Sequence, residues 1–381
     1  MTSKSLTDIL YRYRYVLTGI IWLLSTLLYL NIHGLVTTLE AGKYIEEANR
    51  HIDTGSFSSP RFYFYSTTLF IMVLAIKLKI GMLGAFVIQS LLNLFAYLFF
   101  LKALNKIFKT AVTPLIIILY LFIFNPYQSW IVFLYTESAF FSSVLILIST
   151  LILFKPDNIK NIALIILVLL FTIVSRPLGI LLGTGVYLYL IFYASKKWKI
   201  VLVYSSVILI LTGYFLINLI FNNITDWSIT QAFEQESIIC DMPAALPYQK
   251  LDLANSGSPV YHLWYYLSHN FSHFLHFTGV KIQYFFLMTR KYYSNGHNYF
   301  LLLNVIPLYT LSLCSFFIKI QYFSKGFTAF LVSTILLYTL TIIFQCDDYH
   351  SRFILSIYPF FVILAAKAAE HFILRSFKNN I

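Results

Sequence analysis

Charged residues are scarce in this chain. Asp, Glu, Lys and Arg together make up 11% of its 381 residues, whereas hydrophobic residues make up 59%. A soluble protein of this length carries roughly 25% charged residues, because water must solvate its surface. Most side chains here must therefore face something other than water, which excludes an ordinary soluble domain.

Cysteine is scarce as well. The three cysteines, Cys240, Cys314 and Cys346, are too few and too widely spaced to predict a disulfide framework or a zinc site. The chain also lacks a recognisable groove-reading motif, although its formal net charge is +12. We therefore expect no nucleic-acid partner and assign the excess of basic residues to loops beside a membrane.

Long apolar runs dominate what is present. Runs such as 16–36 and 200–221 are long enough to cross a hydrocarbon core of about 30 Å as helices. A membrane β-barrel would instead need alternating segments of about ten residues. The sequence thus predicts an all-α polytopic membrane protein, with residues 1–381 forming a single membrane domain of about ten transmembrane helices. The predicted spans are 16–36, 84–104, 112–134, 138–154, 161–175, 177–194, 200–221, 299–318, 326–344 and 353–373.

The segment Phe62–Ile76 decides the topology. It is short, follows Pro60 and contains hydroxyl residues, so we interpret it as a re-entrant or interface-lying helix that does not cross. With the N-terminus cytoplasmic, every later cluster of Lys and Arg then falls on the cytoplasmic side, as the positive-inside rule requires. These clusters lie at 102–109, 155–160, 196–199, 319–325 and 375–378.

This topology predicts that both termini are cytoplasmic. It also predicts two large extracytoplasmic segments: a first loop at 37–83 that carries juxtamembrane helices, and a larger loop at 222–298. The acidic residues fall mainly on the same outer side. Any chemistry is therefore expected at the extracytoplasmic face.

Four separate segments bring charged residues to this outer face. They contain Glu40, Glu137, Arg176 and the run 347–352. Charge at the edge of a membrane is costly, so each such residue is a functional candidate. Their predicted convergence on one side of the membrane is the strongest indication of a site.

Such a set suits the transfer of a sugar from a phosphate leaving group. A carboxylate, here Glu40 or Glu137, can deprotonate an acceptor hydroxyl. Guanidinium groups can hold a lipid phosphate with two hydrogen bonds and offset its charge as it leaves. The predicted substrate-binding residues are Arg61, Arg176, Asp347, Asp348, His350 and Arg352.

Each candidate also has a purely structural interpretation. Glu40 and Glu137 can each stabilise the N-terminus of a helix. Arg176 can extend its side chain from the end of a span towards water. Asp347 and Asp348 can be solvated loop residues or oxygen ligands of a divalent metal, although we expect no metal cofactor.

Three histidines in the second outer loop, His269, His273 and His276, follow helical spacing. They lack nearby cysteines or acids, so an amphipathic helix on the outer leaflet is favoured over a zinc site.

The order of these features resembles the multi-spanning glycosyltransferases of the GT-C fold, notably bacterial relatives of protein mannosyltransferases and aminoarabinose transferases. Those families show a first span, an acidic residue followed by Tyr and Ala, and then a Gly. Here these positions are Glu40, Tyr44, Ala48 and Gly55, followed by an aromatic-rich juxtamembrane helix from Pro60. A second carboxylate and a late arginine match Glu137 and Arg352. The first family acid is usually Asp, so the presence of Glu40 leaves the base open between Glu40 and Glu137.

The resemblance implies an inverting glycosyltransferase in a bacterial cytoplasmic (inner) membrane. It implies a polyprenyl-phosphate sugar donor and a glycan, lipid or protein acceptor. Three alternatives remain: a lipid-linked glycan transporter or flippase, a surface-glycan polymerase, and a glycosylphosphatidylinositol-pathway mannosyltransferase. A transporter would place paired charges near the middle of the membrane and often shows inverted repeats.

Overall fold

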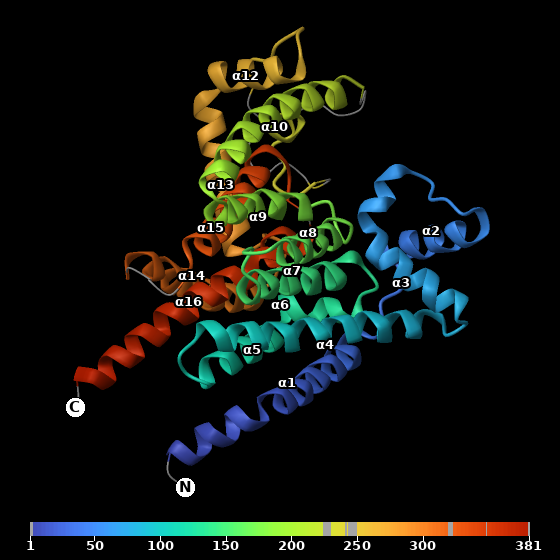
Figure 1. Ribbon diagram of the computed structural model, residues 1–381. Helices are drawn as coiled ribbons and strands as arrows, with labels where there is room; N and C mark the ends of the chain where they lie inside the picture. The colour runs from blue at the N-terminus through green and yellow to red at the C-terminus, as the bar shows by residue number, and fades with distance from the viewer. Residues whose placement is uncertain are drawn as a thin grey trace.

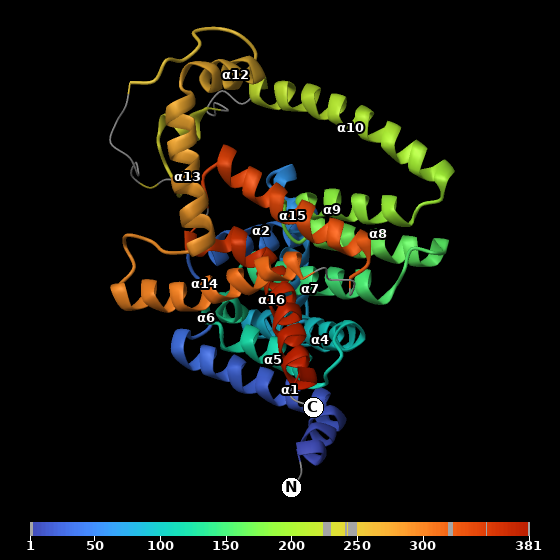
Figure 2. The same ribbon diagram turned by 90° about the vertical axis from the view of Figure 1, so that its left-hand side faces the viewer.

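The computed structural model describes residues 3–223, 230–240, 242, 250–318, 323–347 and 349–379, and α-helices dominate these ranges (Figures 1 and 2). The helices of the first half are α1 (Ser3–His33), α2 (Glu40–Thr54), η1 (Pro60–Tyr65), α3 (Ser66–Lys77), α4 (Gly81–Ile107), α5 (Val112–Ile123), α6 (Asn125–Gln128), η2 (Ser129–Val132), α7 (Thr136–Leu153) and α8 (Ile159–Ile173). Those of the second half are α9 (Gly179–Tyr193), α10 (Lys196–Asn223), α11 (Gln231–Glu234), α12 (Pro259–His269), α13 (Phe271–Leu287), α14 (Asn295–Phe317), α15 (Lys325–Phe344), η3 (Tyr349–Ser351) and α16 (Arg352–Asn379).

The described residues contain seven helices that are long and apolar enough to cross a membrane, namely α1, α4, α7, α10, α14, α15 and α16. An eighth is possible if α5 and the segment Asn125–Val132, which are bent by 74° relative to each other, form one broken span. The all-α polytopic class is therefore confirmed.

The two remaining predicted spans correspond to α8 and α9, which have 15 residues each. At about 1.5 Å per residue they are roughly 22 Å long, shorter than a hydrocarbon core of about 30 Å. The total of about ten crossings thus stays a prediction.

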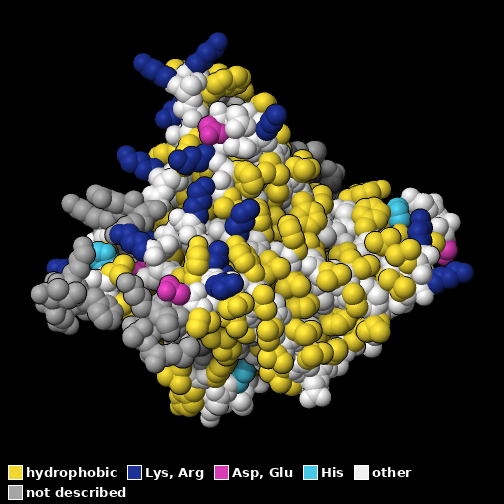
Figure 3. Space-filling model, turned by 60° about the horizontal axis from the view of Figure 1, so that its bottom comes forward, with side chains coloured by type: hydrophobic (Ala, Val, Ile, Leu, Met, Phe, Trp, Pro, Cys, Tyr) yellow, Lys and Arg dark blue, Asp and Glu magenta, His cyan; other side chains and the backbone are white. Residues whose placement is uncertain are grey.

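The surface has the character that a bilayer requires. One face of the molecule shows a broad area in which hydrophobic side chains predominate, with Lys and Arg mostly over its upper and left parts and a few at its right-hand end (Figure 3). Exposed apolar side chains along α1 include Val16, Leu24 and Ile32, and Leu83 and Leu91 are similarly exposed on α4. Apolar patches of this extent on a soluble protein would mark an interaction surface; here they fit contact with lipid tails.

Two helices form the centre of the bundle. α7 is buried from Thr136 to Leu151, and α16 is buried along most of its first half. Polar side chains tie the neighbouring helices to them: Asn93 on α4 accepts from Trp22 Nε1 of α1 at 3.0 Å and donates to Ser142 Oγ of α7 at 3.1 Å. Hydrogen bonds of this kind fix the relative positions of helices whose apolar surfaces alone specify little.

The segment Phe62–Ile76 lies in η1 and α3. α3 has 12 residues and is not among the helices long enough to cross. Its buried face, which includes Leu69 and Met72, packs in the bundle beside α2 and α4. α2 and α3 project on the right in Figure 1, whereas the start of α1 and the end of α16 both lie at the lower left.

The described part of segment 222–298, which was predicted to be the larger extracytoplasmic loop, has a small core in which Phe233 of α11 packs against Tyr266 and Phe277. The three histidines considered above as zinc ligands do not share one environment. His273 is buried and hydrogen-bonded to Tyr266 at 2.7 Å and Glu236 at 3.1 Å, whereas His269 and His276 are exposed.

A disulfide joins this segment to the chain just after α15, which corrects the expectation drawn from cysteine number and spacing. Cys240 and Cys346 are 106 residues apart in sequence, and their Cα atoms are 5.1 Å apart, within the usual range for a disulfide. A β-bridge between Ile239 and Asp347 aligns the two segments, with Cys240 N donating to Asp347 O at 3.1 Å. Sequence spacing could not reveal this pairing, because the bridge forms between segments that are distant in the chain.

Candidate functional site

A short backbone pairing brings the starts of α2 and α7 together. Val36, just after α1, donates to Val132 O at 3.0 Å and accepts from Leu134 N at 3.1 Å. Each segment then enters a helix within a few residues, and the first turns contain Glu40 and Glu137. A carboxylate is favoured in the first turn of a helix, where the helix dipole is positive.

Two arginines from distant segments join these carboxylates. Arg352 Nη1 donates to Glu40 Oε2 and also to Glu137 Oε1, the latter at 3.0 Å. Arg176 Nη1 donates to the same oxygen of Glu137. Two carboxylates and two guanidinium groups therefore form one connected cluster, and Glu137 is its centre. We call Glu40, Glu137, Arg176 and Arg352 the charged cluster.

The two carboxylates differ in exposure. The Glu137 side chain is fully buried (0% exposed), whereas that of Glu40 is 28% exposed. Tyr44 Oη also donates to Glu40 Oε1 at 2.9 Å. Burial opposes ionisation of Glu40, but the adjacent Arg352 guanidinium outweighs burial and holds the pKa of this carboxyl below its ordinary value of 4.5. Glu40 is thus an ionised carboxylate whose side chain is partly exposed.

Three consecutive residues at the start of α7 each have a side-chain oxygen that lacks a hydrogen-bond partner among the described residues. These oxygens are Thr136 Oγ1, Glu137 Oε2 and Ser138 Oγ, all of which are buried. Buried polar groups in folded proteins are usually satisfied, so a run of three needs an explanation.

Arg176 is positioned by the tight turn between α8 and α9. At Gly179 a Cβ atom would lie 2.6 Å from the carbonyl oxygen of Thr172, so a larger residue would push the two helices apart. Thr67 of α3 holds the same turn through a hydrogen bond to Ser175 at 2.8 Å.

A cavity of about 530 Å³ opens beside Arg176. Its wall is mostly apolar, with contributions from Pro177, Leu181 and Phe353, and the Cys240–Cys346 disulfide also borders it. An apolar pocket with a single guanidinium group matches a lipid chain that ends in a phosphate.

A second ion pair holds the residues that precede Arg352. Arg290, between α13 and α14, is buried and donates through Nη2 to Asp347 Oδ2 at 2.8 Å and to Ser351 Oγ at 2.9 Å. It thereby anchors the residues before Arg352. Arg290 was not predicted as a site residue; its partners are 57 and 61 positions away, so sequence spacing gave no indication of the contact.

Backbone strain concentrates around the charged cluster. Leu39, His350 and Ser351 have φ values of 56°, 57° and 56° and directly precede Glu40 and Arg352. Left-handed φ is uncommon for residues other than glycine and recurs at functional sites, where the surrounding structure enforces it. The geometry of the Glu40–Arg352 pair is therefore held at a cost in backbone energy.

The other predicted site residues lie apart from the charged cluster or outside the described residues. Arg61 is exposed and stacks on Phe62, with 5.2 Å from its guanidinium carbon to the ring centroid. His350 faces a second cavity, described below. Asp347 pairs with Arg290 instead of standing as a solvated acid, and Asp348 lies outside the described residues. Among the residues that the structure describes, no group of three or more His, Cys, Asp or Glu side chains is arranged to hold a metal ion.

Comparison of this chain with protein-family models, with curated proteins and with solved structures finds no match.

Proposed function

We propose that this protein is an inverting glycosyltransferase that moves a sugar from a polyprenyl-phosphate donor to an acceptor hydroxyl at the outer face of the membrane. The observation that carries the proposal is the charged cluster, which joins four segments distant in the chain at the first turns of the two most buried helices. Buried ion pairs contribute little to stability on balance, so their presence favours a functional role.

In the proposed reaction the Glu40 carboxylate accepts the proton of the acceptor hydroxyl. The acceptor oxygen attacks the anomeric carbon of the donor, and a new C–O bond forms there with inversion. The bond from that carbon to the phosphate oxygen breaks, and its electron pair leaves with the lipid phosphate. Arg176, which borders the large cavity, offsets the charge that develops on the phosphate.

The assignment of Glu40 as the base follows from its exposure. A general base must come within hydrogen-bond reach of the proton that it accepts. Glu137 is fully buried and accepts from both arginines, so it orients them instead. Glu40 shares Arg352 with Glu137 but keeps 28% of its side chain exposed.

The orientation of the chain rests on two independent supports. Lys and Arg cluster in the loops that the positive-inside rule assigns to the cytoplasm. The Cys240–Cys346 disulfide, near Arg176, belongs in an oxidising compartment. We therefore propose cytoplasmic termini, about ten crossings in a GT-C-like arrangement with α8 and α9 among them, and a bacterial inner membrane.

The test uses purified protein in liposomes that contain a polyprenyl-phosphate sugar labelled in the sugar. The proposal predicts that label moves to an added acceptor and that Glu40→Gln abolishes this movement while donor binding persists. Label that crosses the bilayer without leaving the lipid would instead identify a transporter and overturn the proposal.

A further inference from the structure

A second cavity lies at the start of α16, and its lining differs from that of the cavity beside Arg176. Ser351, just before Arg352, lines this cavity of about 180 Å³, whereas Phe353, just after it, lines the larger one. The Arg352 guanidinium carbon lies 5.0 Å from the ring centroid of Trp130, which also lines the smaller cavity. The charged cluster thus has a cavity next to each of its arginines: Arg176 lines the larger one, and Arg352 lies against Trp130 of the smaller one.

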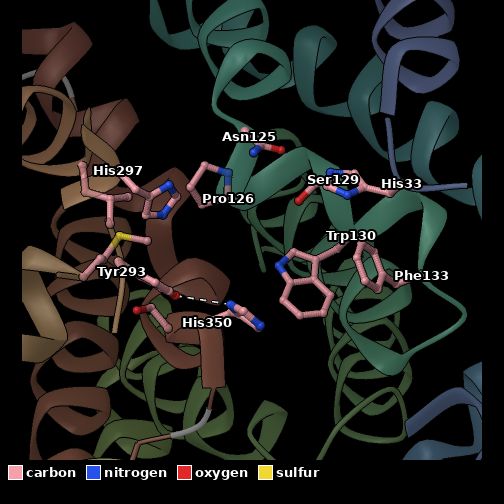
Figure 4. Close-up of a pocket in the computed structure, with 12 residues that line it drawn as sticks. His33, Asn125, Pro126, Ser129, Trp130, Phe133, Tyr293, His297 and His350 are labelled. Carbon is pink, nitrogen blue, oxygen red and sulfur yellow. Dashed lines mark hydrogen bonds between the residues drawn. The ribbon is translucent and has the colours of Figure 1, made fainter. Parts of the chain in front are cut away.

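The smaller cavity has a mainly apolar, aromatic wall that also presents several uncharged hydrogen-bonding groups. Figure 4 shows rings gathered around it from α1, η2, the turn after α13, α14 and η3. Its described lining contains no Lys, Arg, Asp or Glu. Hydrogen-bonding groups come from imidazole, indole, phenol, amide and hydroxyl side chains; they belong to His33, Asn125, Ser129, Trp130, Tyr293, His297 and His350.

This lining matches a neutral ring with many hydroxyl groups. Aromatic faces such as that of Trp130 can pack against the C–H face of a pyranose, and imidazole and amide groups can hydrogen-bond its hydroxyls. A phosphate or carboxylate ligand would find no lysine or arginine in the lining. The volume is below the roughly 300–1,000 Å³ of a drug-sized pocket, so it suits a single ring and not a chain.

The cavity wall is held in a strained conformation. Met288, His350 and Ser351 all line the cavity and have positive φ angles of 59°, 57° and 56°. Tyr293 Oη and His350 Nδ1 are 3.2 Å apart and hydrogen-bonded, which fixes the imidazole at the rim (Figure 4). Strain enforced at several positions of one wall is typical of a preformed binding site.

We infer that this smaller cavity binds the terminal pyranose of the acceptor glycan. The inference rests on the proposed function for the identity of the reaction and adds the substrate class at the acceptor side. A ring stacked near Trp130 lies beside Arg352, which holds the proposed base Glu40. The donor phosphate, held at Arg176, would approach from the larger cavity.

Binding is tested first, without donor. Purified protein is mixed with the methyl glycosides of glucose, galactose, mannose and N-acetylglucosamine, and saturation-transfer NMR detects binding. Ser129→Phe fills the cavity and His297→Ala removes a polar group from its wall, whereas His269→Ala is a matched control at an exposed histidine outside it. We expect at least one glycoside to bind wild type and the control, and to lose most of its signal in both cavity variants.

Failure of all four glycosides to bind, or equal binding to every variant, would overturn the inference. Kinetics separates this outcome from failure of the proposed function. If transfer occurs, both cavity variants should raise KM for the acceptor roughly tenfold, equivalent to about 1.4 kcal/mol, and leave KM for the donor unchanged. Transfer with an unaltered acceptor KM would contradict the acceptor site alone, whereas sugar binding without any transfer would contradict the proposed function alone.

Discussion

The charged cluster is neutral overall, so we expect a defined loss in the free energy of unfolding when Glu137 is replaced. Replacing it with Met removes one carboxylate from a set of two acids and two arginines, and leaves a net positive charge in a buried setting. Removing one partner of a buried ion pair typically costs about 3–5 kcal/mol. We expect Glu137→Met and Arg176→Met each to lower the free energy of unfolding by about this amount.

The double variant Glu137→Met/Arg176→Met should be more stable than the sum of the two losses implies. It restores neutrality, because Glu40 and Arg352 remain paired with each other. Side chains in direct contact show coupling of about 0.5–3 kcal/mol in double-mutant cycles. Unfolding in mixed micelles with increasing SDS, followed by circular dichroism, gives the free energy of unfolding of wild type, of the two single variants and of the double variant.

A matched control separates stability from chemistry. Glu370, which is buried on α16 and accepts from Lys109 N at 2.8 Å and Lys367 Nζ at 3.0 Å, lies far from the cluster along the same helix. Glu370→Met should lose stability but keep sugar transfer per folded molecule, whereas the double variant should lose transfer even where stability recovers. Strictly additive losses, or a Glu137→Met variant as stable as wild type, would refute the reasoning.

Three further predictions concern other parts of the site. Arg176→Lys should raise KM for the donor roughly tenfold in transfer assays, because lysine cannot present a bidentate fork to phosphate; an unchanged KM would place the phosphate elsewhere. The variant Cys240→Ala/Cys346→Ala should lose about 4–5 kcal/mol in the SDS titration, as expected for release of a loop of about 100 residues, whereas Cys314→Ala, at a free cysteine, should lose little. The pKa of Glu40 lies below 4.5, so its ion pair should stabilise the protein above that pH and lose this effect as pH falls further; melting temperatures between pH 7 and 3 should fall less steeply for Glu40→Gln than for wild type.

Much of the fold follows from the sequence because lipid imposes simple rules. In a bilayer, a continuous apolar run such as 200–221 can satisfy its backbone hydrogen-bonding groups only as a helix. The helix α10 occupies that region. Helix lengths were less predictable. The run 112–134 breaks near Phe124, where Pro126 cannot donate a backbone hydrogen bond, and the chain turns by 74°.

The site was predictable to the extent that charge at a membrane edge is costly. That argument singled out Glu40, Glu137, Arg176 and Arg352, which the structure joins in one cluster. It singled out Asp347, Asp348 and His350 equally, and these lie apart from the cluster or outside the described residues. It could not show which groups pair with which. Arg290 and the Cys240–Cys346 disulfide depend on contacts between segments far apart in the chain, and apolar periodicity carries no information about such contacts.

Donor turnover by wild type and Glu40→Gln, measured side by side at the same lipid concentration, tests the central claim most directly. Both proteins should retain the polyprenyl-phosphate sugar with similar affinity, because Arg176 and the large apolar cavity are unchanged. We predict that wild type passes the sugar to the acceptor and that Glu40→Gln does not. Equal turnover by the two proteins would contradict the assignment of Glu40 as the base and, with it, the chemical role of the cluster.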